Sequence, residues 1–219
     1  MSTIPKRSIG LLLGLQITLL PLSVVAQATG QYGIPEPKVG NTWRYRTIDL
    51  WNNKELFSWE LELVEIQPDR LIHRMTNVET RVTQTQRTDR DLSPCRRDVG
   101  ADNEVCVGAL AFPLRVGDKY QYERQPWPNG NGYYSGKCKA AAAENVTVPA
   151  GTYETIRVEC KGTWTRVSGG ALSGNITQTL WYSTKVNRLV KWIFIDYKPS
   201  GKREADTKRQ TEMIEFIQK

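Results

Sequence analysis

The sequence predicts an all-β protein, mainly antiparallel, in which about ten strands form a curved sheet, a half-barrel or an open barrel. Three observations support this prediction. Short runs of alternating apolar and polar residues, the period of a half-buried strand, recur along most of the chain. Clusters of Asn, Asp, Gly and Pro separate these runs and favour turns. Little helix is expected outside the N-terminal segment, although the pattern from Glu204 to Phe216 fits either a helix or a strand.

The run from Gly132 to Trp164, GYYSGKCKAAAAENVTVPAGTYETIRVECKGTW, is predicted to form one long β-hairpin. Its turn is expected around Pro149, which fixes φ for a tight turn, while Gly151 tolerates a positive φ. Apolar residues alternate with polar ones on the return strand, so one register places the apolar side chains of both strands on one face. The opposed pairs expected in that register are Cys138 with Cys160, Ala140 with Val158, Ala142 with Ile156 and Tyr134 with Trp164.

The chain contains four cysteines, which allow three disulfide pairings. The hairpin register selects Cys138 with Cys160, because a cross-strand disulfide needs two cysteines at directly opposed positions on one face. Cys95 and Cys106 are then left to close a short polar loop. A metal site is not expected, since no C-x-x-C spacing occurs and His73 is the single histidine.

Eight further strands follow from the same alternation. The run 57–63 alternates most cleanly and is expected to pair with the strand before it. The Thr- and Gln-rich run 80–88 suits a sheet edge, whereas 189–197 is apolar on both faces and suits a central strand. A basic loop at 198–209 is expected to precede the last strand. The eight strands are 39–45, 57–63, 71–76, 80–88, 116–122, 176–182, 189–197 and 210–217.

Residues 1–28 have the order of a Sec-type signal peptide. A short basic head precedes the apolar run 11–25, which ends in the small-x-small site Ala26-Gln27-Ala28. We expect a mature chain that begins at Thr29 or Gln27, is periplasmic or secreted, and has no lipid-attachment cysteine at the cleavage site. An N-terminal membrane anchor is the alternative, although the apolar run is short for a span and contains Pro21. No later segment is long and apolar enough to suggest an integral membrane protein.

The domain organisation expected after the signal peptide is a linker at 29–38 and a single β-rich domain at 39–219. A weak repeat lies inside this domain, because VGNTWRY at position 39 returns as VGDKYQY 77 positions later. The repeat allows two related halves, 39–108 and 109–219. A chance match between two turn-and-strand segments is the alternative.

The formal net charge is +7, or +5 without the two basic residues of the signal peptide. The densest basic region is 70–97, with seven arginines, and 198–209 is a second one. Either region could contact an anionic envelope surface, while a solvated strand face and a solvated loop are the alternative. Nucleic acid is not an expected partner, because the predicted destination is outside the cytoplasm.

The sequence contains no recognisable catalytic constellation. His73 lies in a strand-like run, and the chain has no Gly-x-Ser-x-Gly elbow. Glu60 and Glu62 share a strand face, but that face lies opposite an apolar stripe, where solvent exposure is the default. Phosphate-binding glycine loops and calcium loops are also lacking from the sequence. We therefore predict no catalytic residue and no cofactor, and we consider an enzyme the least favoured class.

Three short motifs carry a resemblance to a known group of proteins. They are VTVPAGTYE at 146–154, LWYS at 180–183 and FPL followed by VGD at 112–118. With these motifs the chain resembles uncharacterised exported bacterial β proteins that contain a domain of unknown function. The resemblance implies a fold similar to the curved antiparallel sheets of periplasmic lipoprotein carriers. It covers the second half of the chain and implies no active site, and the helices that plug such carriers have no counterpart in the sequence.

The favoured function is a periplasmic or secreted, non-catalytic binding module for a hydrophobic or amphipathic envelope ligand such as a lipid. The ligand would lie on a concave, aromatic-lined surface of the sheet. The alternative is a structural or interaction protein of the envelope that contacts anionic polymers, lipid head groups or a protein partner. Trp127 lies in a loop between two prolines, where packing over the core rim is the alternative to ligand binding. The candidate ligand-binding residues are Trp43, Tyr45, Trp59, Trp127 and Trp181.

Overall fold

Twelve strands with antiparallel pairing make up the regular structure of the computed structural model, which describes residues 30–170, 172–197 and 205–219. No helix occurs within these three ranges. The prediction of an all-β, mainly antiparallel fold is therefore confirmed. The predicted signal peptide, residues 1–28, and the part of the predicted basic loop at 198–204 lie outside the described residues.

The strands are β1 (Thr42–Asp49), β2 (Lys54–Ile66), β3 (Arg70–Asn77), β4 (Thr83–Asp89), β5 (Cys95–Arg97), β6 (Glu104–Cys106), β7 (Lys119–Pro126), β8 (Gly132–Val148), β9 (Gly151–Arg166), β10 (Leu172–Ser183), β11 (Arg188–Tyr197) and β12 (Ala205–Ile217).

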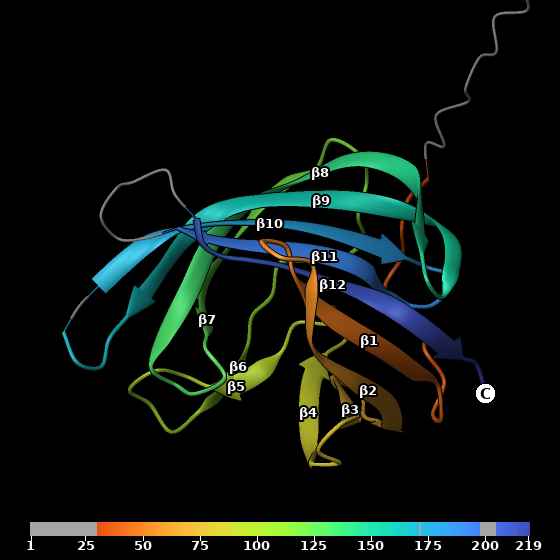
Figure 1. The fold of residues 1–219 in the computed structure, drawn as a ribbon, viewed down its shortest axis with the longest axis horizontal. Coiled ribbons are helices and arrows are strands. Elements are labelled where there is room, and N and C mark those ends of the chain that lie inside the picture. The colour runs from red at the N-terminus through yellow and green to blue at the C-terminus, as the bar shows by residue number, and fades with distance from the viewer. Residues whose placement is uncertain (1–29, 171, 198–204) are drawn as a thin grey trace, which may run out of the picture.

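Ten of these strands form one curved sheet in the order β4-β3-β2-β1-β12-β11-β10-β9-β8-β7. The sheet consists of two meanders, β1 to β4 and β7 to β12, which join where β1 pairs with β12. It arches over without closing into a barrel, so that β4 and β7 remain as its two edges (Figure 1). The short ribbon β5-β6 belongs to the connection between the meanders and lies beneath the arch (Figure 1).

Several strand positions follow the sequence predictions. Strand β2 pairs with β1, the Thr- and Gln-rich β4 is an edge strand, and β11 lies centrally between β10 and β12. The helical alternative for residues 204–216 is wrong, because β12 begins at Ala205 and pairs with a neighbour on each side. Tertiary pairing overrides a local helical pattern here, and residues 205–209, predicted as part of the basic loop, belong to β12.

The long hairpin is formed by β8 and β9. Three predicted pairs are present: Cys138 with Cys160, Ala140 with Val158, and Tyr134 with Trp164. The fourth is wrong, because Ile156 faces Ala143 rather than Ala142. A β-bulge after Ala140 inserts one extra residue into β8 and shifts the register toward the turn. The turn itself is the two-residue loop Pro149-Ala150, and it is not centred on Pro149 as the sequence suggested.

Both predicted disulfides form, and the structure contains no free cysteine among its described residues. Cys138 and Cys160 join β8 to β9 with their Cα atoms 4.1 Å apart, and both are buried. Cys95 and Cys106 join β5 to β6 with a Cα separation of 3.9 Å. One disulfide therefore lies in the core of the sheet and the other in the connection beneath it.

The segment before β1, expected to be a linker, packs against the sheet. Tyr32 and Leu114 exchange two backbone hydrogen bonds of 2.8 and 2.9 Å. The Tyr32 hydroxyl also donates to the carbonyl oxygen of Thr155 at 3.3 Å, and the residue is only 4% exposed. The segment before β1 thus contributes the side chain of Tyr32 to the core.

The two Val-Gly motifs occupy equivalent places in their meanders. Gly40 precedes β1 with φ of 88°, and Gly117 precedes β7 with φ of 100°, a left-handed conformation that glycine adopts without strain. The Gly40 amide donates to Leu63 on β2, and the Gly117 amide donates to Ala140 on β8, each at 2.8 Å. In both places a 2.9 Å bond returns to the residue after the glycine. The repeated motif therefore makes the same hairpin-opening contacts twice.

The buried side chains form two clusters. One gathers around β7 to β10 and the segment 109–114 and includes Tyr122, Val158 and Tyr182. The other gathers around β1 to β3 and the tip of the long hairpin and includes Trp43, Leu61 and Met213. Leu92 and Trp192 pack against both clusters. The two clusters meet at these residues, beside the cavity described next.

Candidate ligand-binding cavity

A cavity of about 500 Å³ opens between the sheet and the connection from β4 to β7. Every strand of the large sheet except β9 contributes at least one lining side chain. Because the β5-β6 ribbon lies beneath the arch, the cavity is on the concave side (Figure 1). Its volume falls within the range of roughly 300–1,000 Å³ that is typical of small-molecule sites.

Aromatic side chains form the wall on the sheet side. Tyr45 and Trp59 stack with their ring centroids 4.5 Å apart, and Trp192 tilts against them at 5.5 and 6.1 Å. Phe194 continues this wall and meets Tyr134 edge to face at 5.8 Å. Trp192 and Phe194 share a face because they are two residues apart on β11. The wall offers a broad apolar surface with few rotatable groups.

The opposite wall is the connection between β4 and β7, residues 90–114, which we call the flap. The flap crosses the gap between the two edges of the sheet, and the disulfide Cys95–Cys106 ties its two arms together. It places seven residues against the cavity: Leu92, Ser93, Pro94, Arg96, Gly108, Ala109 and Leu110.

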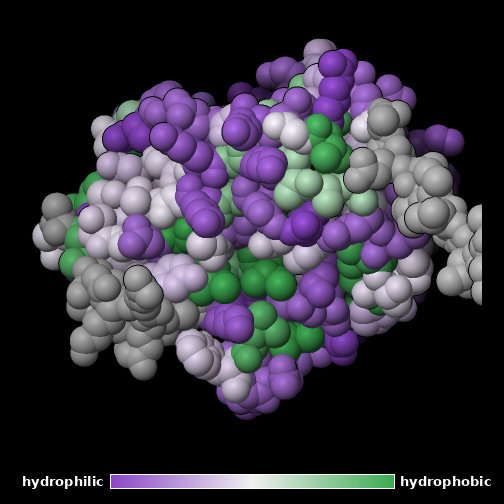
Figure 2. Space-filling model, turned by 90° about the horizontal axis from the view of Figure 1, so that it is seen from above, coloured by the Kyte–Doolittle hydropathy of each residue, from purple (hydrophilic) through white to green (hydrophobic). Residues whose placement is uncertain are grey.

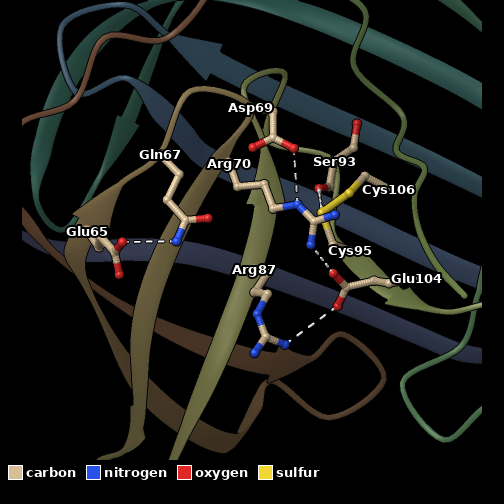
Figure 3. A network of polar contacts seen from close by, with 9 residues as sticks. All are labelled: Glu65, Gln67, Asp69, Arg70, Arg87, Ser93, Cys95, Glu104 and Cys106. Atoms are coloured by element: carbon tan, nitrogen blue, oxygen red, sulfur yellow. Dashed lines mark hydrogen bonds and ion pairs between the residues drawn. A yellow bond between two sulfur atoms is a disulfide. The ribbon is translucent and has the colours of Figure 1, made fainter.

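Polar contacts fasten the flap to both edges of the sheet. Glu104 on β6 forms an ion pair with Arg70 on β3 and a second with Arg87 on β4 at 3.6 Å (Figure 3). On the other side, Arg96 of β5 donates from Nη1 to the carbonyl oxygen of Pro126 at the end of β7, at 2.7 Å. The flap is therefore held at β3 and β4 on one side and at β7 on the other.

Three arginines line the cavity: Arg96, Arg188 and Arg209. Among the described residues, no aspartate or glutamate lines it. Arg209 is exposed, whereas Arg188 is only 8% exposed. Since arginine stays protonated in proteins, the lining carries positive charge and no negative charge from the described chain.

The guanidinium of Arg188 lies among uncharged groups. Its Nη1 donates to Nε2 of His73 at 3.2 Å, and its Cζ lies 5.3 Å from the centroid of the Trp43 ring. Burial, followed by repulsion from Arg188, lowers the pKa of His73 to about 2, so the imidazole is neutral. Burial raises the pKa of the neighbouring Tyr45 to about 12, which keeps that phenol neutral as well. The Tyr45 hydroxyl donates to the carbonyl oxygen of Leu189 at 2.8 Å.

Two of the five aromatic candidates, Tyr45 and Trp59, line the cavity. Trp43 is not among the lining residues; like Tyr45 it is buried in the second core cluster. Its Nε1 donates to the carbonyl oxygen of Val186 at 2.8 Å, and its ring stacks on Phe216 at 5.9 Å. Trp43 therefore supports the site from behind and reaches it only through Arg188.

Trp127 and Trp181 also lie away from the cavity. Trp127 packs against Tyr134 and Trp164, with centroid distances of 5.6 and 6.1 Å, as expected for the core-rim alternative. Trp181 follows the lining residue Leu180 on β10 and so points to the other face of the sheet. There its Nε1 donates to Glu144 at 2.6 Å. The sequence could not place these two side chains, because it does not show which loop or strand face borders the cavity.

Several lining residues that the sequence did not single out lie on β11 and on its neighbours β10 and β12. Trp192 and Phe194 alternate on one predicted strand, which was a usable signal. Arg209 belonged to the second basic region of the sequence, which gave no indication of a cavity, and Arg188 gave no signal, since an arginine at a strand end is usually a solvated group. Their role becomes visible only once the fold brings both beside the aromatic wall.

Four of the seven arginines in the region 70–97 are engaged in contacts within the protein. Arg70 and Arg87 are paired with Glu104, and Arg74 is paired with Glu62, while Arg96 points to the cavity and to β7. These ion pairs weaken the case for a polyanion-binding arginine face.

On the side over β8 and β9, hydrophilic residues predominate and apolar residues form small groups between them (Figure 2).

Within the described ranges, no group of three or more His, Cys, Asp or Glu side chains is arranged to hold a metal ion. The same residues include no helix with the length and apolar character needed to cross a membrane.

Comparison with known proteins identifies relatives by fold only. No protein-family model and no curated protein matches the chain. A Bacteroides fragilis protein described as exported, with a YmcC-like fold, superposes with a TM-score of 0.51 at 9% identity, covering 86% of this chain and all of that one. A Parabacteroides distasonis protein described as a lipoprotein superposes with a TM-score of 0.53 at 13% identity, covering 85% of this chain and 99% of that one. The chain thus shares the architecture of these two solved structures.

Proposed function

We propose that the protein is a non-catalytic binding module outside the cytoplasm that holds a hydrophobic or amphipathic envelope ligand in the cavity. The observation that supports this most directly is the aromatic wall of Tyr45, Trp59 and Trp192 facing a cross-linked flap across about 500 Å³. A preformed apolar cavity with a few polar groups is the usual form of a small-molecule site.

The location outside the cytoplasm has three supports. Both cysteine pairs are oxidised, and disulfides persist mainly in oxidising compartments such as the periplasm. The two structural neighbours are described as an exported protein and a lipoprotein. The order of the predicted signal peptide points the same way.

The chemical nature of the polar groups at the cavity supports the non-catalytic assignment. A general base needs a free lone pair within reach of the reacting group. The single histidine, His73, is completely buried and its Nε2 accepts from Arg188. The lining side chains otherwise supply amide, hydroxyl and guanidinium groups, which suit binding better than proton transfer.

A pair of tryptophan variants tests the proposal. Trp59→Ala removes part of the cavity wall, whereas Trp51→Ala removes a tryptophan that is 60% exposed at the tip of the β1–β2 hairpin. A neutral apolar fluorescent dye should bind the native protein and be displaced by a lipid extract of the envelope. Its affinity should fall about tenfold or more in Trp59→Ala, because a contacting aromatic side chain is lost.

Trp51→Ala should bind the dye as the wild type does. The proposal fails if the folded wild-type protein binds neither the dye nor any lipid, or if the two variants lose the same affinity. Circular dichroism of both variants verifies that the sheet is intact.

A further inference from the structure

We propose that the ligand is a single-chain amphiphile with an anionic head, a carboxylate or a phosphate, that binds Arg188 while its chain lies on Trp59 and Trp192. This inference rests on the proposed function and adds the charge and the orientation of the ligand.

The first step is the state of Arg188. It is a cation that is more than nine-tenths buried, and a buried charge is costly unless an opposite charge accompanies it. Its neighbours His73, Trp43 and Tyr45 are all uncharged. Within the described chain, no carboxylate lies within ion-pair distance of this guanidinium, although ten such pairs form elsewhere.

The second step is the direction in which Arg188 can bind. The guanidinium has five N–H donors in a planar fork, and one of its nitrogens is engaged with His73. Arg188 is itself a lining residue of the cavity. A carboxylate or phosphate accepts two parallel bonds from such a fork, and these charge-assisted bonds are among the strongest in proteins.

The third step is the continuity of the charged and apolar parts. Arg188 adjoins Tyr45, which stacks on Trp59, and Trp192 tilts against both rings. A head group at Arg188 would therefore place an attached chain on the aromatic wall. The cavity is lined by one buried cation beside a continuous apolar surface, which matches a molecule with one charged end.

The fourth step is the field at the cavity. Arg96 and Arg209 also line it, and no acidic residue of the described chain does. Charges of one sign in a low-dielectric cleft attract an oppositely charged ligand and repel a ligand of like charge. A cationic amphiphile is therefore disfavoured at this site.

Titration of the wild-type protein with a matched series tests the inference directly. The series is dodecanoate, dodecyl phosphate, dodecanol and dodecyltrimethylammonium at neutral pH, with quenching of tryptophan fluorescence as the signal. Both anions should bind at least about tenfold more tightly than the alcohol, and the cation should bind more weakly than the alcohol. The stronger of the two anions identifies the head group. Acetate and inorganic phosphate should bind far more weakly than their dodecyl counterparts.

Arg188→Gln should abolish the preference for the anions over dodecanol, and Arg188→Lys should retain part of it. Arg166→Gln is the matched control, because Arg166 is exposed at the end of β9 and its loss should leave the preference unchanged. Equal binding of the anions and the alcohol to the wild type would overturn the inference, even if Arg188→Gln does not fold. A preference that survives unchanged in folded Arg188→Gln would also overturn it. If no member of the series binds, the proposed function itself fails.

Discussion

Arg188 and His73 form a buried contact in which only one partner is charged. A protonated His73 would place a second positive charge 3.2 Å from the guanidinium, and both side chains are buried. Both burial and this repulsion favour the neutral imidazole, and the pKa of His73 falls from 6.5 to about 2. Because arginine can only donate, Nε2 of His73 must accept and its proton must reside on Nδ1. The tautomer of the single histidine is thus fixed by its neighbour.

This contact predicts a pH dependence of stability. Below about pH 6.5 the unfolded chain binds a proton at His73 that the folded protein does not bind until about pH 2. The unfolded state is therefore favoured as the pH falls through this window, and stability rises with pH. Between pH 6.5 and pH 5 the loss attributable to His73 should be about 2 kcal/mol. Urea unfolding at several pH values measures it.

His73→Gln provides the control for that measurement, because glutamine can accept a hydrogen bond from Arg188 without titrating. The difference between the two proteins isolates His73 from carboxyl groups such as Asp196, whose pKa burial raises. The variant should lose less stability than the wild type between pH 6.5 and pH 5. Parallel curves for the two proteins would show that His73 is not held neutral.

At the scale of elements, the long hairpin depends on its disulfide. Cys138–Cys160 closes a loop of 22 residues, and restriction of the unfolded chain by such a loop stabilises the folded state by about 3 kcal/mol. The double variant Cys138→Ala with Cys160→Ala should therefore have a clearly lower melting temperature. Differential scanning calorimetry measures the change, and a melting temperature equal to that of the wild type would contradict the prediction.

The flap disulfide should act differently. Cys95–Cys106 lies in a two-stranded ribbon outside the large sheet, which contacts the sheet through Arg96 and Glu104, so its removal should loosen the flap before it loosens the sheet. In the double variant Cys95→Ala with Cys106→Ala, amide hydrogen exchange should increase in residues 90–114 and stay unchanged in β8 and β9. Faster exchange across the long hairpin as well would show that the flap is part of one cooperative unit with the sheet.

Alternation in the sequence was enough to predict approximate positions for the ten strands of the large sheet, because the period of two determines which side chains share a face. It also predicted the hairpin register near Cys138, where both strands are regular. It did not predict β5 and β6, which lie in a segment expected to be a polar loop. It could not predict the bulge after Ala140, since the run of four alanines gives no apolar-to-polar contrast to mark an extra residue. The extent of β12 could not be predicted for a different reason: the pairing that extends it involves β1, which lies far away in the chain.

The candidate site was less predictable than the fold. Tyr45 and Trp59 both line the cavity, and each lies on an apolar strand face. Trp43 lies on that same strand face, yet it is completely buried in the core. Alternation reports the face of a residue and not its distance from the open end of a cavity. Arg188 lines the cavity because neighbouring strands and the flap enclose the space beside it. Neither of these arrangements leaves a local pattern in the sequence.

For the whole molecule, the two meanders meet at one strand pair within the sheet. β1 pairs with β12 from Thr42 and Ile217 to Asp49 and Arg209, and Thr47 and Thr211 share a buried hydroxyl contact of 2.9 Å across this joint. Without β12, the inner edge of β1 and one edge of β11 would expose unpaired N–H and C=O groups. The joint thus completes both meanders at once.

A truncation tests the importance of this joint. A chain that stops at residue 204 lacks β12 and should aggregate or lose cooperative thermal unfolding. Removal of Lys219 alone, whose backbone amide donates to Oδ1 of Asn41 at 3.0 Å, should cost one hydrogen bond and leave thermal unfolding cooperative. Light scattering and calorimetry distinguish the two results. A soluble, cooperatively folding chain without β12 would show that each meander is stable alone.

The pairing of β1 with β12 also governs when folding can finish during biosynthesis. β1 is the first strand of the sheet to be made and β12 the last, so for most of translation the inner edge of β1 has no partner. A nascent chain in this condition exposes an open template for association with other chains. The strand order therefore delays completion of the sheet until β12, the last of the described strands, has been synthesised.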